Sequence, residues 1–278
     1  MSVFRLATLN VHSFIDSQAT SNIERLAQLL KPLALDVLAV QEACHTPDNR
    51  RNRAQTAFVE TRYHSQVLSE LLQLSYKVFG DNVRNFGNGI LSRYPITNAS
   101  NYQIEPQASE AVRGMLTVEV DNEFCKDNKA TIHVTHFLDH ISEHRRLSQL
   151  HLFDKHVLTT AQNSRHLQLL LGDFNSLTFE DYSQNYFDQK IRQVRDQNLW
   201  EPPYDLVIKK IKESGFQDCF KHMNKEMKNE QLATCAYSTR IDYIWMRGEL
   251  KNGWQLQECK IFSTENATDH NGILLVDS

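Results

Sequence analysis

The sequence has no excess of basic residues. Its 278 residues include 30 Lys and Arg against 34 Asp and Glu, which gives a formal net charge of −4. A strongly basic balance would have indicated a protein that binds nucleic acid broadly, and that class is excluded. The slightly acidic net charge also disfavours tight, sequence-independent binding to duplex nucleic acid. Any contact with nucleic acid must therefore come from local basic patches.

Cysteine is scarce, and long apolar runs are missing. The five cysteines are widely scattered and odd in number, which indicates free thiols in a reducing compartment. No apolar run approaches the roughly 18 residues that a membrane span needs. The first ten residues lack the charged region and apolar core of a signal peptide. We therefore expect an intracellular protein of the cytoplasm or nucleus, monomeric and without stable membrane association.

The length and composition suit one large folded unit. Hydrophobic residues make up 41% of the chain, which is enough to form a substantial core. A length of 278 residues is normal for a single large α/β domain or sandwich. No internal repeat, low-complexity run or linker interrupts the sequence. We therefore expect a single domain over residues 1–278.

The most informative stretch is residues 169–176, Leu-Leu-Leu-Gly-Asp-Phe-Asn-Ser. An apolar run of strand length is followed at once by Asp173 and Asn175. Side chains alternate along an extended chain, so strand periodicity would point both residues to the same side. A carboxylate and an amide at the end of a buried strand cost free energy unless they are used there. This stretch is therefore the first candidate for a functional site.

Polar residues also end other predicted strands. Phe4–Leu9 leads into Asn10, Asp36–Gln41 leads into Glu42, and Asp269 precedes a last strand. Asn10 on its own can simply turn the chain, and Glu42 can be a solvated strand end. Asn10, Glu42, Asp173, Asn175 and Asp269, however, can all bind a metal ion through a side-chain oxygen. Oxygen ligands with few Cys or His suit a hard cation, Mg²⁺ first and Mn²⁺ second.

The histidines at 133, 136, 140 and 144 raise the alternative of a zinc site, since a spacing of four residues suits zinc on a helix. His136, however, ends a predicted strand, Thr131–Thr135, and no Glu lies between the pairs as in a zinc protease helix. Zinc is therefore disfavoured. Asp242 is a different case, because it lies inside an apolar strand and needs a partner there. Arg240, two residues away, is the simplest structural partner.

Several of these segments, in this order, resemble the motifs of the endonuclease/exonuclease/phosphatase superfamily, which has the DNase I-like fold. The segments that carry the resemblance are Leu9-Asn10-Val11, Gln41-Glu42, Gly87 to Ile96, Val134 to His140, Gly172 to Asn175, Arg240 to Trp245 and Thr268 to His270. Asp139-His140 stands one residue later than in the usual motif. The resemblance implies an α/β fold, a four-layered sandwich of two packed mixed β-sheets flanked by helices, with the site at the strand ends.

The resemblance also implies roles for individual residues. Glu42 would hold the metal, with Asn10 and Asp269 nearby. Asp173 would orient or deprotonate the attacking water, and Asn175 would donate to the developing oxyanion. His136 and His270 would be catalytic residues that donate to phosphoryl oxygens. Asp242 would also be catalytic, because it would fix the tautomer and charge of His270.

Substrate contacts are predicted at Arg51, Asn88 and Arg113. Arg51 belongs to an arginine-rich loop that can bind phosphate or simply be solvated, and Arg113 can instead cap a surface. The aromatic segment 177–204 can stack bases, but packing of an insertion against the body is the favoured interpretation.

We therefore predict a Mg²⁺-dependent phosphodiesterase, with DNA or RNA as substrate, especially ends or single strands. The alternative is a phosphoesterase for a small or lipid-linked phosphate, such as an inositol phosphate or a sphingomyelin-like lipid, or for a tyrosyl–DNA adduct. A third hypothesis is a non-catalytic binding module on a decayed enzyme fold.

Overall fold

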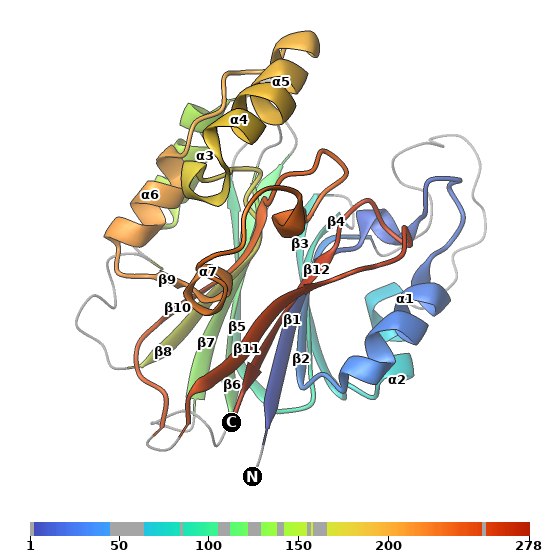
Figure 1. The fold of residues 1–278 in the computed structure, drawn as a ribbon. Coiled ribbons are helices and arrows are strands. Elements are labelled where there is room, and N and C mark those ends of the chain that lie inside the picture. The colour runs from blue at the N-terminus through green and yellow to red at the C-terminus, as the bar shows by residue number, and fades with distance from the viewer. Residues whose placement is uncertain are drawn as a thin grey trace.

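Two six-stranded mixed sheets packed face to face form the centre of the molecule (Figure 1). The computed structural model describes residues 3–44, 64–83, 86–104, 112–121, 129–137, 142–154, 157, 166–251 and 254–278. In order across the first sheet, the strands are β11 (Leu256–Phe262), β12 (Gly272–Asp277), β1 (Phe4–Asn10), β2 (Val37–Cys44), β4 (Phe86–Ser92) and β3 (Tyr76–Val83). In the second sheet they are β5 (Ile96–Ile104), β6 (Arg113–Asp121), β7 (Lys129–His136), β8 (Leu167–Asp173), β10 (Asp242–Arg247) and β9 (Gln217–Asp218).

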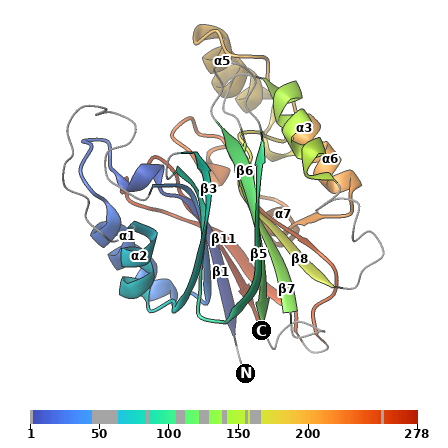
Figure 2. The same cartoon turned by 180° about the vertical axis from the view of Figure 1, so that it is seen from behind.

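Helices cover the outer face of each sheet, which completes four layers and confirms the predicted fold class (Figures 1 and 2). The first sheet is covered by α1 (Ile23–Leu30) and α2 (His64–Leu72). The second is covered by α3 (Glu143–Leu152) and α6 (Leu206–Glu213). The remaining helices are α4 (Gln184–Tyr186), α5 (Gln193–Gln197) and α7 (Cys219–Met223).

The strand alternation of apolar residues divides the core into separate layers. In β1, Leu6 faces the other sheet and packs in the central cluster with Leu171 of β8, whereas Leu9 packs with α1. In β8, Leu170 faces the opposite way and packs with Ile208 of α6. β1 and β8 thus each bury both of their faces, as expected for strands in the middle of a sheet covered on both sides.

Two parallel strand pairs position the candidate residues. β1 runs parallel to β2, with Asn10 opposite Gln41, and β7 runs parallel to β8, with His136 opposite Asp173. Parallel strands bring their carboxyl ends to the same edge of a sheet. The polar residues that end these four strands therefore gather at one edge of the sandwich.

The two chain ends lie together at the opposite edge (Figure 1). β1 pairs antiparallel with β12, so that Phe4 is opposite Asp277. Within the described residues, no helix has both the length and the apolar character needed to cross a bilayer. Of the five cysteines, the structure describes Cys219, Cys235 and Cys259 as free thiols, in agreement with the prediction.

Candidate active site

Three neighbouring strands place their polar ends in one row. His136 of β7 lies opposite Asp173 of β8, and Asp173 lies opposite Asp242 of β10. The close approach of β7 and β8 depends on Gly172. Its φ is +134°, and a Cβ at this position would lie 2.0 Å from the carbonyl oxygen of Thr135. Only glycine fits both the conformation and the space, which explains the Gly before Asp173.

The first sheet supplies Asn10 and Glu42. Asn10 is the last residue of β1, and its backbone pairs with β2. Glu42 lies in β2 at an interruption of the pairing with β4, and its φ is +53°. A bulge of this kind re-aims a side chain, and such irregularities are common next to active sites. The carboxylate of Glu42 is 15% exposed and comes within 3.5 Å of Asn10 Nδ2.

Asp173 is the centre of the site. Its Oδ2 is 3.1 Å from Asn10 Nδ2, 3.6 Å from His136 Nε2 and 3.7 Å from His270 Nε2. Burial, together with the negative charge of Asp242, raises the pKa of Asp173 to about 7. Near neutral pH, this carboxyl group can therefore both accept and release a proton, which suits a general base.

Asp242 pairs with His270, as the family resemblance implies. His270 Nδ1 is 2.9 Å from Asp242 Oδ2, and both side chains are buried. Burial alone would lower the pKa of His270, but the Asp242 carboxylate outweighs it and raises that pKa well above the usual value. His270 is therefore held as an imidazolium, with Nε2 directed toward Asp173.

Arg240, the simpler partner considered for Asp242, binds elsewhere. Its guanidinium donates to Asp181 at 2.7 Å and to Asp218 at 2.7 Å, and all three side chains are buried. Asp181 belongs to the segment 177–204, and Arg240 lies two residues before the first residue of β10, Asp242. This ion triad therefore links that segment to the start of β10.

His136 is oriented by Arg113 of β6. The guanidinium Nη1 lies 3.1 Å from His136 Nδ1. Because arginine can only donate, Nδ1 accepts, and the imidazole proton is on Nε2. That nitrogen faces Asp173 and lies 3.8 Å from Glu42 Oε1. Arg113 is buried, so the structure places it behind His136 rather than at an open substrate surface.

Asn88, another predicted substrate contact, does not face an open surface. Asn88 is fully buried in β4, and its Nδ2 donates to the carbonyls of Gly114 and Val134 in the other sheet. It therefore ties the two sheets together. Arg51 lies outside the described residues, as do Asp139 and His140. His133 pairs with Thr117 at 2.9 Å and does not join His136.

Asn175 does not follow the predicted strand alternation. The strand ends at Asp173, and Asn175 has a φ of +47°. Its backbone N–H donates to Asp173 Oδ1 at 2.9 Å, and its Nδ2 donates to the carbonyl of Phe137 at 3.2 Å. The side chain thus reaches the site through a left-handed turn, which asparagine tolerates better than most residues.

His12 is a site residue that the sequence reasoning missed. Its Nδ1 is 2.8 Å from Asp269 Oδ1, and this hydrogen bond raises the pKa of His12. Burial alone would raise the pKa of Asp269, but the hydrogen bond from His12 and the charge of His270 lower it overall. His12, Ser13 and Phe14 all have positive φ. The only sequence signal is a histidine two residues after Asn10.

A family model describes this arrangement. The model of the Endonuclease/Exonuclease/phosphatase family matches residues 7–258. The chain belongs to this family. Proteins of the family hydrolyse phosphate esters, and the present chain has the corresponding phosphoesterase fold. No curated protein matches the sequence.

Solved structures of family members have the same fold. An endonuclease/exonuclease/phosphatase from Beutenbergia cavernae DSM 12333 has a TM-score of 0.71 at 18% identity, over 100% of this chain and 72% of that one. A family protein from Leptotrichia buccalis C-1013-b has a TM-score of 0.65 at 20% identity, over 98% of each chain. D. rerio TDP2, solved with single strand DNA product, has a TM-score of 0.65 at 14% identity, over 100% of each chain.

Proposed function

We propose that this protein is a divalent-metal-dependent phosphodiesterase that acts on nucleic acid. The observation that carries the proposal is the convergence on Asp173. One carboxylate whose pKa is about 7 is faced by two imidazole Nε2 atoms, at 3.6 and 3.7 Å. A base and two phosphate-binding donors around one point are what in-line attack of water on a phosphoryl group requires.

We assign the protein's own groups as follows. Asp173 takes the proton from the attacking water. The Nε2–H groups of His136 and His270 donate to the phosphoryl oxygens, and the imidazolium of His270 also neutralises their charge. The second Nδ2–H of Asn175 donates to the oxygen charge that develops during attack. Water oxygen bonds to phosphorus, and the ester oxygen leaves with its electron pair.

A hard cation fits the acidic side of the site. Glu42 offers a carboxylate that solvent can reach, and Asp269 Oδ2 has no hydrogen bond within the described part of the chain. Mg²⁺ typically takes one or two carboxylates, substrate phosphate and waters, and Mn²⁺ accepts the same ligands. When bound, such an ion neutralises phosphoryl charge and stabilises the leaving oxygen. Glu42 and Asp269 are therefore the proposed ligands.

Asn10 has a different role in this arrangement. Its Oδ1 accepts the backbone N–H of His12 at 3.0 Å, while its Nδ2 faces Glu42 and Asp173. The amide nitrogen cannot bind a cation. We therefore assign Asn10 to holding the two carboxylates in place, rather than to the metal itself.

Nucleic acid is proposed as the substrate because a relative of the same fold was solved with single strand DNA product. Two basic residues of the segment 177–204, Lys190 and Arg195, line the cavity that also contains His270 and can supply the local positive charge that the net composition lacks. We further propose an intracellular, monomeric enzyme, in keeping with the free thiols at Cys219, Cys235 and Cys259.

The test is hydrolysis of a substrate panel with Mg²⁺, Mn²⁺ or EDTA. The panel contains single- and double-stranded DNA, RNA, a 5′-tyrosyl oligonucleotide, an inositol phosphate and sphingomyelin. Wild type is compared with Asp173→Asn and with Asp196→Asn, a control that changes an exposed carboxylate. Cleavage of nucleic acid that is lost with EDTA and with Asp173→Asn, but kept in Asp196→Asn, supports the proposal.

Other outcomes of this panel are equally informative. Cleavage of the inositol phosphate or sphingomyelin alone would replace nucleic acid by a small or lipid-linked phosphate. Cleavage of the tyrosyl adduct alone would restrict the substrate to DNA adducts. Full activity in a folded Asp173→Asn protein would contradict the catalytic assignment. Binding of nucleic acid without cleavage of any substrate would favour a binding module.

A further inference from the structure

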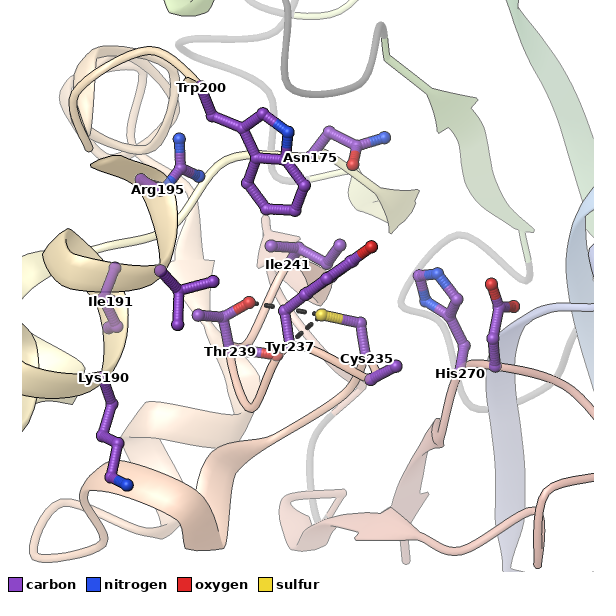
Figure 3. A pocket seen from close by; sticks show the side chains of 13 residues that line it. Asn175, Lys190, Ile191, Arg195, Trp200, Cys235, Tyr237, Thr239, Ile241 and His270 are labelled. Carbon is purple, nitrogen blue, oxygen red and sulfur yellow. Dashed lines mark hydrogen bonds between the residues drawn. The ribbon is translucent and has the colours of Figure 1, made fainter. Parts of the chain in front are cut away.

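A cavity of about 200 Å³ lies directly beside His270 (Figure 3). One wall comes from the segment 177–204, through Ile191, Val194 and Trp200. The other wall comes from the loop that precedes β10, including Tyr237, and from His270 itself. The function proposed above uses His270, Asn175 and Asp269 from this lining, together with the charges of Lys190 and Arg195, but gives no role to the apolar and aromatic side chains.

The lining suits a flat ring. Trp200 and Tyr237 meet edge to face, with ring centroids 4.8 Å apart and an angle of 85° between the planes. Such a pair leaves ring faces on which a third ring can stack. Ile191 and Ile241 add apolar surface, and the guanidinium of Arg195 lies on the same side as Trp200 (Figure 3).

Two further observations indicate a ligand rather than simple packing. The helical segment that supplies Ile191 contains a π-helical turn, Phe187–Arg192, and such turns are rare and frequent at functional sites. A large aromatic side chain of the lining is also exposed, since Tyr237 is 57% exposed. An exposed aromatic ring offers a face on which a ligand ring can stack.

Other residues of the segment 177–204 pack it against the rest of the protein. Tyr182 and Phe187 are buried and form a small cluster with Leu177 and Ile191. Tyr182 also accepts the backbone N–H of Arg240 at 2.9 Å. The segment is therefore anchored by these aromatic residues.

The size and position of the cavity define its ligand. An apolar cavity of about 150 Å³ binds benzene, so this one has room for a single ring. His270, Asn175 and Asp269 belong to its lining, whereas Glu42 and His136 do not. A ring held here would therefore lie on the His270 side of the proposed phosphoryl position, next to Asp269, one of the two proposed metal ligands.

We propose that this cavity is a subsite for one aromatic ring carried on an ester arm of the substrate phosphate, a proposal that rests on the function proposed above. The ring can be a nucleobase, linked through its sugar, or a phenol, linked directly. Both share the same chemistry, a flat ring within a few bonds of the phosphorus. The subsite would select substrates by that ring, whatever the rest of the molecule.

The experiment compares three phosphate monoesters that share one phosphoryl group and differ in the ring. Phenyl phosphate, thymidine 5′-monophosphate and ring-free 2-deoxyribose 5-phosphate are titrated by calorimetry into the Mg²⁺-loaded protein. We expect at least one ring-bearing ester to bind about tenfold more tightly than the ring-free one, as one stacked ring typically allows. The ring-bearing ester that binds more tightly identifies the preferred ring as a phenol or a nucleobase.

Variants of the cavity show whether its side chains cause the difference in affinity. Trp200→Ala and Tyr237→Ala should each bring the ring-bearing ester close to the affinity of the ring-free one. Tyr204→Ala is the control, since Tyr204 is 41% exposed and packs near His144 instead of lining the cavity. It should leave all three affinities unchanged. Circular dichroism melting confirms that each variant is folded, and having two cavity variants keeps the test valid if one is not.

The outcomes separate this proposal from the function on which it rests. Equal affinities for all three esters in an active enzyme would overturn the subsite alone. Ring selectivity that survives in both folded cavity variants would also overturn it. If both variants lose the ring selectivity, the subsite is supported, whether or not a diester of the panel is cleaved. If no diester of the panel is cleaved, the phosphodiesterase assignment is overturned instead.

Discussion

The site contains two histidine–aspartate pairs that differ in one respect. His270–Asp242 and His12–Asp269 have nearly equal separations, 2.9 and 2.8 Å. In the first pair the side chains are 10% and 1% exposed, and in the second they are 37% and 48% exposed. The pKa is raised in both histidines, but only that of His270 is raised well above its usual value.

This comparison shows that burial, rather than distance, decides what such a pair can do. Water screens an exposed ion pair and leaves it worth little, whereas a buried pair interacts strongly. The inner pair can therefore hold a charged imidazole in a fixed orientation beside Asp173. The outer pair can only bias its histidine, at the edge of the site where solvent and the proposed metal also compete for Asp269.

The largest effect is expected when the inner pair is broken. Asp242→Asn removes the charge that keeps His270 protonated, so kcat for the phosphodiester cleaved in the panel should fall by about 10³-fold, as for loss of one preorganised donor. NMR titration of the His270 imidazole should show its pKa decrease. An unchanged kcat in the folded variant would show that the Asp242 charge is not needed.

A smaller effect concerns the carboxylate that the inner pair faces. The pKa of Asp173 rises from 3.8 to about 7 on folding. Between these values the folded protein holds a proton that the unfolded chain has released, so stability falls as pH rises, and above pH 7 the whole penalty is present. In EDTA, Asp173→Asn should therefore raise Tm by about 3–6 °C at pH 8.

The pH dependence provides the control for this prediction. At pH 4 the Asp173 carboxyl is protonated in the folded protein and about 40% protonated in the unfolded chain, so only a small part of the penalty is present and wild type and Asp173→Asn should melt at similar temperatures. Differential scanning calorimetry at pH 4, 6 and 8 measures the trend. A variant that is less stable than wild type at pH 8 would mean that the ionised carboxylate stabilises the fold.

The smallest effect is expected for the outer pair. Asp269→Gln keeps a polar side chain but removes both the charge beside His12 and one of the two proposed metal ligands. At saturating Mg²⁺, which compensates for weaker binding of the ion, kcat should fall by about tenfold or less, within the range of an exposed ion pair. The pKa of His12, followed by NMR, should decrease toward its usual value in this variant and also in wild type at high salt. A loss as large as that in Asp242→Asn would show that the two pairs are equivalent.

The arrangement of the sheets was predicted through the family resemblance, and the residues at the centre of the candidate site were selected because they lie at strand ends. Asp173, His136 and Asp242 each end or begin a strand, and strand pairing alone brings them into one row. The free thiols and the two-sheet fold were also predicted correctly. Asp242 was correctly linked to His270 through the resemblance, whereas Arg240 as its partner was wrong.

Features that depend on backbone irregularity could not be predicted in this way. The left-handed conformations of Asn175 and of His12 occur at residues other than glycine, so the sequence carries no signal for them. Arg113 and Asn88 were chosen as polar residues near a motif, and only the packing of the two sheets shows that both are buried. The aromatic segment proved to contain both anchoring residues and cavity-lining residues.

The pairing of Phe4 with Asp277 has a practical consequence. Both strands end at the edge of the molecule farthest from the site, next to each other (Figure 1). A short linker can therefore join them in a circular permutant, and a fluorophore or a solid support can be attached at this edge. The candidate site at the other edge would remain accessible to a polymeric substrate of the proposed kind, so the immobilised protein suits a single-molecule test of cleavage.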